Sequence, residues 1–518
     1  MPIVTRRRFL AAASVTGLAT LSPSLLLASR SARAAPRTSV RVGTRTIEVA
    51  GRPATVFGLT QPDGTHGLLA EAGQRFRVRL ENALDEQTLV HWHGLTPPWQ
   101  QDGVPHLSQA PLEPSAAYDY DFALARPGTN WMHSHHGLQE QRLLAAPLIV
   151  RDPGEVNADV QDVVVMFHDY TFRDPDEILA SLQGRGQAGG AHGAAVQGAG
   201  GHASAPHGTG PVRRMMDSVT PTPGSGHGGT GHAAMDRGTG HGAMGAGGAG
   251  AHLHDVEYDA FLANDRALDD PQVFRVEPGG RVRLRLINAA TATNFWIDLG
   301  SLDGRLIAVD GMPVAPISAR RFEFAIAQRL DIVLELPRGE GAWPVFAQRE
   351  GERARTGFVL ATPGGVIRRL AAQADEPAAP VGLALEQRLR AARPLPARQA
   401  DREHMITISE APGYVWMLNG AVHGAHTPLA VREGERVEIT FTDQSTMAHP
   451  MHLHGHPFQV VALDGERFAG AMRDTVLVPS RGRVTVAFDA TNPGRWALHC
   501  HHLYHMAGGM MTTIEYQG

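Results

Sequence analysis

Residues 493–510 read PGRWALHCHHLYHMAGGM, and the architecture of the whole chain follows from this segment. It contains the only cysteine of the 518 residues, Cys500, and a histidine stands on each side of it. We predict a β-strand over residues 496–501, in which alternate side chains point to opposite faces. Cys500 then faces one way and both flanking histidines the other, so one tripeptide reaches two different sites.

The side chains near Cys500 have the composition of a metal site. His505 follows five residues on and Met510 ten residues on, and His449 stands upstream in a His-Pro-Met-His segment. Two imidazoles, a thiolate and a distant thioether are the ligand set of a blue electron-transfer copper. A His-Cys-His tripeptide alone is also compatible with a chance cluster.

Four His-x-His pairs occur along the chain, counting the one around the cysteine. On a strand, residues two apart share a face and lie about 6.5 Å apart, so each pair can serve neighbouring metals. Together they supply enough imidazoles for a cluster of three metals between the first and last domains. The pairs are His91 and His93, His133 and His135, His452 and His454, and His499 and His501.

Three segments, 71–82, 277–288 and 432–443, share one pattern: a turn glycine, an arginine two residues later, and a strand that alternates apolar with polar residues. Such a repeat predicts three related β-sandwiches in an all-β chain. We place them at residues 36–155, 255–365 and 403–518, with a linker at 366–402. The middle one has no histidine or cysteine at the position that corresponds to the ligand strands, so we expect it to be a structural spacer.

Composition supports this organisation. A chain of 518 residues suggests roughly three domains of about 150 residues each. The 58 glycines and 35 prolines favour short strands and turns over helical bundles. The formal charge of −5 gives no indication of a nucleic-acid partner.

The N-terminus has the order of a secretory signal. Arg6, Arg7 and Arg8 precede an apolar, Ala-rich run, and Ala32-Arg-Ala34 offers a cleavage site. Paired arginines before Phe-Leu are typical of twin-arginine export. We therefore predict a signal peptide at 1–34, recognition by the twin-arginine machinery, a periplasmic protein and no stable membrane span; a membrane anchor is the alternative. One cysteine cannot form a disulfide within the chain, which favours a metal-bound thiol.

Residues 174–254 form a segment rich in glycine, histidine and methionine. Such a composition cannot bury enough apolar surface to fold, so we predict a disordered insert between the first and second domains. It is either a plain linker or a place of labile copper capture, because thioethers suit Cu(I) and imidazoles suit Cu(II).

The ordered set HWHG, HSH, HPMHLHG and HCHxxxHxxxxM resembles the multicopper oxidase family over nearly the whole mature chain. The resemblance implies three cupredoxin-like Greek-key domains and four copper ions. It assigns a type 1 copper to His449, Cys500, His505 and Met510, and a type 2 copper to His91 and His452. It assigns a type 3 pair to His93, His133, His135, His454, His499 and His501.

The segments at 88–95, 102–109, 137–141 and 169–175 look like those of bacterial periplasmic copper-resistance oxidases. This resemblance implies oxidation of Cu(I), coupled to reduction of O2 to water, by an enzyme that we expect to be a monomer. A laccase-like oxidase of phenols and a copper-sequestering protein with incidental oxidase activity are the alternatives.

Further residues receive roles from the same resemblance. Cys500 passes electrons through His499 and His501, and Asp102 resembles the family carboxylate that relays protons, although Asp-Gly is also a common turn. Four methionines could guide Cu(I) or could simply pack: Met447, Met472, Met506 and Met511. Four histidines beside the ligand motifs are expected to support the ligands or lie at the surface: His106, His136, His456 and His502.

Overall fold

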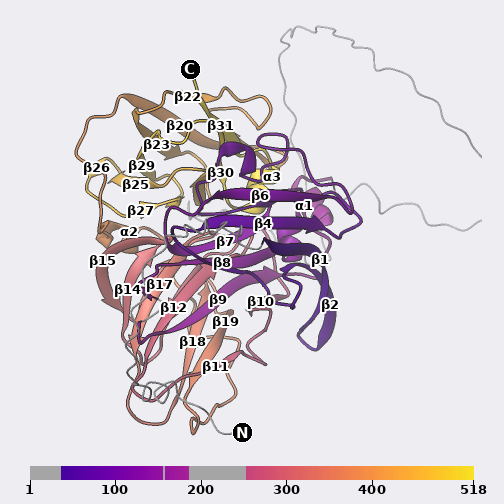
Figure 1. Ribbon diagram of the computed structural model, residues 1–518, viewed down its shortest axis with the longest axis vertical. Coiled ribbons are helices and arrows are strands. Elements are labelled where there is room, and N and C mark those ends of the chain that lie inside the picture. The colour runs from indigo at the N-terminus through magenta and orange to yellow at the C-terminus, as the bar shows by residue number, and fades with distance from the viewer. Residues whose placement is uncertain (1–36, 156–157, 186–252) are drawn as a thin grey trace, which may run out of the picture. The chain divides into compact units, whose positions relative to one another are not determined.

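The structure, a computed structural model, describes residues 37–155, 158–185 and 253–518. The predicted signal peptide and most of the predicted insert lie outside these residues. The described residues from Thr38 onward belong to one compact unit. Its strands make six sheets, which pair into the three β-sandwiches that the repeat predicts (Figure 1). Among the described residues, no helix is both long and apolar enough to cross a bilayer.

The first sandwich consists of two four-stranded sheets with the orders β2-β1-β4-β6 and β3-β8-β7-β5. Strand β4 buries every second side chain, because only one face of its sheet covers the core. The strands are β1 (Thr38–Val49), β2 (Arg52–Thr60), β3 (Leu68–Glu71), β4 (Arg75–Asn82), β5 (Val90–His91), β6 (Ala117–Ala123), β7 (Gly128–Ser134) and β8 (Ala145–Arg151), with 3-10 turns at Trp99–Gln101 and Gln139–Arg142.

The second sandwich pairs a six-stranded sheet, β10-β9-β12-β17-β14-β15, with a five-stranded sheet, β11-β19-β18-β13-β16. Its core is the largest apolar cluster and includes Phe167, Phe295 and Phe324. The strands are β9 (Gln161–Tyr170), β10 (Ala260–Ala263), β11 (Val273–Arg275), β12 (Arg281–Asn288), β13 (Phe295–Asp298), β14 (Gly304–Val309), β15 (Met312–Ala319), β16 (Arg321–Phe324), β17 (Arg329–Glu335), β18 (Ala342–Arg349) and β19 (Arg355–Ala361).

Strand β9 precedes the segment 174–254 in sequence, yet it pairs with β12 and β10 of the second sandwich. The second sandwich therefore begins with β9. In sequence, the segment 174–254 lies between β9 and β10, which are neighbouring strands of one sheet. The prediction of disorder is wrong for the start of the segment, where helix α1 (Pro175–Leu182) forms. Its N-cap is Asp174, whose side chain accepts a hydrogen bond from the Asp176 N–H.

The third sandwich has the sheets β21-β20-β23-β29-β25-β26, where β27 also pairs with β25, and β22-β31-β30-β24-β28. Helix α2 (Ala384–Arg388) lies in the linker, and helix α3 (Leu503–Ala507) follows β30. The strands are β20 (Arg402–Ala411), β21 (Val415–Leu418), β22 (Leu429–Val431), β23 (Arg436–Asp443), β24 (His449–Leu453), β25 (Phe458–Leu463), β26 (Glu466–Arg467), β27 (Met472–Arg473), β28 (Thr475–Val478), β29 (Arg483–Asp489), β30 (Arg495–Cys500) and β31 (Met511–Tyr516).

The predicted internal repeat is confirmed by topology. The repeated segments become β4, β12 and β23, and each pairs in parallel with the first strand of its own sandwich, β1, β9 or β20. The turn glycines Gly73, Gly279 and Gly434 all have positive φ, at 85°, 70° and 83°. Glycine adopts this conformation without the strain that a side chain would cause.

Candidate metal centres

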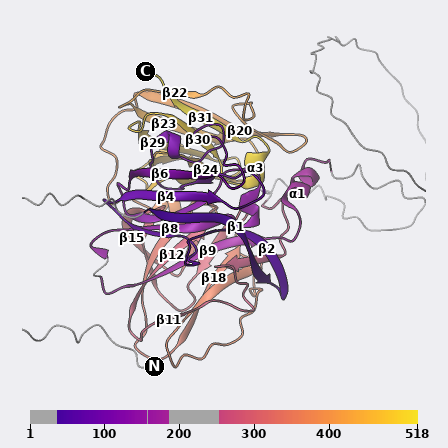
Figure 2. The same ribbon diagram turned by 45° about the vertical axis from the view of Figure 1, so that its right-hand side comes forward.

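Strand β30 spans Arg495–Cys500, so each end lies one residue before the predicted bound of 496–501. His499 and Cys500 are its last two residues, and His501 follows it directly. Strand β30 pairs with β24 so that Met451 is opposite Cys500 and His452 is opposite His499. Because neighbouring residues on a strand face opposite ways, the register directs the cysteine to one side and the two facing histidines to the other. Figure 2 brings β24 and β30 into view beside the strands of the first sandwich.

On the cysteine side, two imidazole nitrogens converge on one sulfur. The Nδ1 atoms of His449 and His505 each lie 3.7 Å from the Cys500 Sγ and 3.2 Å from each other. All three side chains are buried, and fully buried Met510 lies in the same apolar cluster as the cysteine. Burial raises the pKa of the Cys500 thiol, so a thiolate forms here only with a cation to neutralise it. The donor set fits a copper ion.

The outer edges of these two imidazoles are held by the protein. His449 Nε2 lies 2.7 Å from the Ser445 hydroxyl, which itself donates to the Met447 carbonyl and so accepts the imidazole hydrogen. His505 Nε2 lies 3.5 Å from an Asp255 carboxylate oxygen. Both Nδ1 atoms therefore direct their lone pairs toward the sulfur, as ligation requires.

Asp255 belongs to a small buried network beside this site. Its other carboxylate oxygen lies 3.3 Å from His502 Nε2, and the Tyr414 hydroxyl donates to Asp255. The His502 ring stacks on His505 with centroids 3.7 Å apart, while the Trp416 ring lies 4.0 Å from His505 on centroids. His502 thus supports a ligand position, as predicted, but no local pattern points to Asp255, which lies 250 residues before His505 along the chain.

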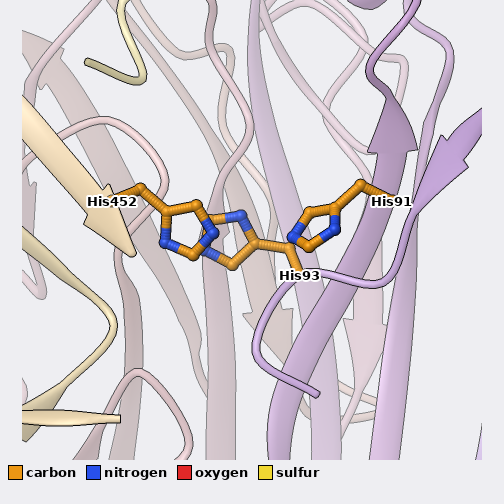
Figure 3. A group of neighbouring side chains, drawn as sticks. All are labelled: His91, His93 and His452. Atoms are coloured by element: carbon orange, nitrogen blue, oxygen red, sulfur yellow. The ribbon is translucent and has the colours of Figure 1, made fainter. Parts of the chain in front are cut away.

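On the histidine side, all four His-x-His pairs meet between the first and third sandwiches. Strands β5 and β7 or the residues after them carry one half, and β24 and β30 or the residues after them carry the other. Within each of three groups, the possible ligand atoms lie within 4.8 Å of one another: His91, His93 and His452; His93, His133 and His501; and His135, His454 and His499. Figure 3 shows the first group, whose three rings point toward one another.

The hydrogen bonds of these rings show which nitrogen is left for a metal. His91 Nδ1 lies 2.8 Å from the Asp102 carbonyl, and His452 Nδ1 lies 2.8 Å from the Asp474 carbonyl. Because a carbonyl oxygen only accepts, both Nδ1 atoms carry hydrogen and both Nε2 atoms keep a lone pair. These two Nε2 atoms are buried and have no hydrogen-bond partner among the described residues.

His93 is turned the other way. Its Nε2 lies 3.1 Å from an Asp474 carboxylate oxygen, and its buried Nδ1 has no hydrogen-bond partner in the described part of the chain. In the remaining groups the Nε2 atoms approach each other, with 3.3 Å between His133 and His501 and 3.0 Å between His454 and His499. Facing lone pairs without hydrogens between them are expected where metal ions sit, so the residues fit a copper cluster.

Burial keeps the rings neutral. Desolvation lowers the pKa of His93, His133, His135 and His452 well below the ordinary value of 6.5, and neighbouring imidazoles lower it further. Only a neutral imidazole can bind a metal through its lone pair.

Three carboxylates orient the rings. An Asp102 Oδ atom lies 2.7 Å from His454 Nδ1, and the other lies 3.4 Å from His91 Nδ1. Glu140 Oε2 lies 3.1 Å from His133 Nδ1. The sequence analysis singled out Asp102, but it missed Asp474, whose contacts depend on tertiary packing, and Glu140, which lies only seven residues after His133.

The middle sandwich, predicted to be a spacer, contributes a buried cation. Arg329 at the start of β17 donates from Nη1 to Asp474 Oδ1 at 2.7 Å, and its Nη2 contacts the other carboxylate oxygen. It also donates from Nε to the Thr129 carbonyl of the first sandwich at 3.1 Å. One side chain thus joins all three domains next to His93.

The other predicted residues lie mainly in packed positions. Met447 belongs to the core of the third sandwich, and Met511 packs against Val104 and Ala497. Met506 packs at the margin of an apolar cluster with Leu503, and Met472 is half-buried. His456 is buried, with its Nε2 2.7 Å from the Tyr516 hydroxyl. His106 is exposed and His136 half-buried.

Comparison with known proteins places this geometry in a family. Three stretches match multicopper oxidase domains, at residues 48–155, 161–362 and 395–517. The chain is 29% identical to multicopper oxidase MmcO of Mycobacterium tuberculosis, over 86% of this chain and 80% of the relative. It is 25% identical to copper resistance protein A of Escherichia coli, over 86% of each chain.

Laccases are also similar. Laccase-2 of Botryotinia fuckeliana is 24% identical over 92% of this chain and 81% of its own. The crystal structure of laccase from Botrytis aclada superposes with a TM-score of 0.69 at 20% identity, over 92% of this chain and 88% of that one. The three sandwiches are therefore cupredoxin-like domains, and the chain belongs to the multicopper oxidase family.

Proposed function

We propose that this chain is a periplasmic copper-tolerance oxidase that oxidises Cu(I) and reduces O2 to water. One observation carries the oxidase assignment: Cys500 belongs to a buried His2Cys group, while the residues on both sides of it belong to groups of converging imidazoles. The likeness to proteins named for copper resistance supports Cu(I) as the substrate. Export by the twin-arginine pathway remains the prediction from the N-terminal sequence.

We assign four copper ions as follows. His449, Cys500, His505 and Met510 would hold the type 1 ion. The lone pairs on His91 Nε2 and His452 Nε2 are assigned to the type 2 ion. The type 3 pair is held by His93, His133 and His501 on one side and by His135, His454 and His499 on the other.

When bound, copper supplies the one-electron redox chemistry that couples substrate oxidation to the four-electron reduction of O2. The protein provides the connection. The Cys500 side chain faces the substrate-oxidising site, and its backbone continues directly into His499 and His501, which face the oxygen-reducing site. Burial of these side chains excludes bulk water from both places.

Reduction of O2 also consumes protons, and we assign their delivery to Asp102. One of its carboxylate oxygens accepts from His454 Nδ1, and the other is buried without a hydrogen-bond partner among the described residues. That second oxygen lies 3.4 Å from His91 Nδ1 without a hydrogen bond, so the carboxylate can accept and release a proton beside the imidazole cluster.

Oxygen uptake by the copper-loaded protein tests the proposal. We expect faster uptake with Cu(I) than with a phenolic donor, and loss of both in Cys500→Ser. A second variant replaces every histidine and methionine of the insert between 186 and 252 by serine and keeps its length. If the insert collects copper, this variant loses Cu(I) oxidation at limiting ion concentration and keeps phenol oxidation. The replaced residues are His192, His202, His207, His227, His232, His241, His252, Met215, Met216, Met235 and Met244.

A laccase-like function is the second candidate, because a laccase aligns with 92% of the chain. It takes the place of the first if phenol turnover far exceeds Cu(I) turnover in the intact protein. Copper tolerance that survives Cys500→Ser in cells would instead favour sequestration by the insert, with oxidase activity incidental.

A further inference from the structure

Two histidines outside the ligand motifs form a pair on the surface of the third sandwich. His423 and His426 lie in the connection between β21 and β22, and their rings stack with centroids 5.3 Å apart and 15° between the planes. His423 is exposed and His426 half-buried, so both rings can be reached from solvent. Neither belongs to the type 1, type 2 or type 3 assignments.

The spacing of this pair matches that of the buried copper-ligand pairs of the same chain. Ring centroids are 4.9 Å apart for His449 and His505, and 5.7 Å apart for His91 and His452. The His423–His426 separation of 5.3 Å falls between these values. The two rings are more nearly parallel than the rings of those pairs, at 15° against 51° and 59°, so the exposed His423 ring has to turn before both imidazoles can share one metal ion.

The pair lies directly outside the Cys500 site. The backbone N–H of His423 donates to the Gly509 carbonyl at 2.9 Å, and Gly509 precedes Met510. His426 Nε2 lies 3.2 Å from the Thr513 hydroxyl on β31. Only a short stretch of backbone therefore separates the surface pair from the axial-ligand position.

Both rings are suited to bind a cation. Burial and the neighbouring imidazole lower the pKa of His423, which keeps its lone pair available near neutral pH. Burial also lowers the pKa of His426, while the Glu515 carboxylate acts in the opposite direction and adds negative charge nearby. His426 Nδ1 accepts a long 3.3 Å bond from the Gly424 N–H, which a metal ion can replace.

We propose that His423 and His426 form the docking site for the substrate Cu(I) ion, an inference that rests on the proposed function. Imidazoles bind both oxidation states of copper, so the site can take the substrate and release the product. Each docked Cu(I) gives up one electron to the type 1 centre and leaves as Cu(II). Four such ions, with four protons, reduce one O2 to two waters.

Residue-level protection tests docking without measuring activity. The copper-loaded protein is modified with diethyl pyrocarbonate with and without Ag(I), a redox-inert analogue of Cu(I), and each histidine is read by peptide mass spectrometry. Modification of His423 and His426 should slow strongly with Ag(I), whereas that of exposed His106 and half-buried His404 should not. Equal rates at His423 with and without Ag(I) would overturn the site, whatever metal the insert binds.

Kinetics test whether the site serves the reaction. We expect His423→Ala and His426→Ala each to lower kcat/KM for Cu(I) about tenfold. The double variant should be little worse than either, because one ion needs both rings. Phenol oxidation and the blue absorption should stay unchanged, and His404→Ala serves as the matched control.

The failures of the two proposals differ. Normal Cu(I) kinetics in the double variant overturn docking and leave the oxidase proposal intact. Absence of Cu(I) oxidation in the unmodified protein overturns the proposed substrate, and with it the role of the pair in catalysis, even where Ag(I) protects both rings.

Discussion

Replacing Arg329 by methionine removes the cation that the middle sandwich places beside the histidine cluster. The Arg329 side chain is fully buried, and the side chain of its partner Asp474 is 5% exposed. Asp474 accepts from both guanidinium nitrogens and also contacts His93 Nε2. Methionine has a similar length and no charge, so the carboxylate would stay buried without its main counter-charge.

The expected cost follows from this burial. Removing one partner of a buried ion pair destabilises a protein by about 3–5 kcal/mol, because the other charge is left uncompensated. Burial already raises the pKa of Asp474, and Arg329 opposes that effect. Without the arginine the pKa should rise further, so that a larger fraction of Asp474 is protonated and orients His93 less firmly.

Urea unfolding followed by tryptophan fluorescence measures the change in apparent unfolding free energy, and metal analysis measures copper content. The matched control is Arg320→Met in the same sandwich, whose ion pair with Asp303 is exposed by 56% and 78%. An exposed pair contributes little to stability, because solvent and salt screen it. We also expect Arg329→Met to be partly rescued by Asp474→Asn, because the second change removes the stranded charge.

The reasoning is refuted if Arg329→Met loses no more unfolding free energy than Arg320→Met and retains full copper content. Failure of Asp474→Asn to recover any stability in the double variant would likewise show that a stranded carboxylate is not the source of the cost.

Three further predictions concern single side chains. Cys500→Ser should abolish the blue absorption and all oxidase activity while the fold, followed by circular dichroism, is kept; residual blue colour would contradict the type 1 assignment. Asp102→Asn should lower oxygen turnover by about 10²–10⁴-fold with the blue absorption intact, and rapid turnover would refute a role in proton delivery. Burial raises the pKa of Glu350 from 4.5 to about 7. The folded state therefore binds more protons than the unfolded state in this window, and stability should fall as pH rises from about 5 to 7, by at most about 1.4 kcal/mol per pH unit. In Glu350→Gln this slope should flatten, as urea unfolding at several pH values would reveal.

The convergence of the candidate ligand residues could be predicted from sequence because their arrangement is local. A His-x-His pair on a strand keeps both rings on one face whatever the rest of the fold does. One long-range contact, the antiparallel pairing that sets His452 opposite His499, is then enough to bring the last two His-x-His pairs together. Repeated turn glycines likewise predicted the three sandwiches.

The supporting residues could not be predicted in the same way. Asp474 reaches His93 across 381 positions of sequence, and no spacing rule connects them. The same holds for strand β9, whose parallel pairing with β12 spans the low-complexity segment. Two neighbouring parallel strands need a long connection between them. The sequence of that connection does not show that the strand before it and the strand after it will pair.

The middle sandwich has no histidine or cysteine where the other two sandwiches carry their candidate ligands, but it still has a role at the histidine cluster. Its Asp310 accepts from Arg473 of the third sandwich at 2.9 Å, and the linker's Glu386 accepts from the same arginine at 2.7 Å. Replacing a whole buried ion pair by apolar residues is often close to neutral for stability, so bulk stability is a weak reason for such a network. We infer that its main effect is on geometry, because buried ion pairs keep their hydrogen bonds only over a narrow range of domain alignments. With Arg329, these contacts hold the first and third sandwiches in the register at which their histidines converge, and the middle sandwich is therefore part of the frame of the histidine cluster.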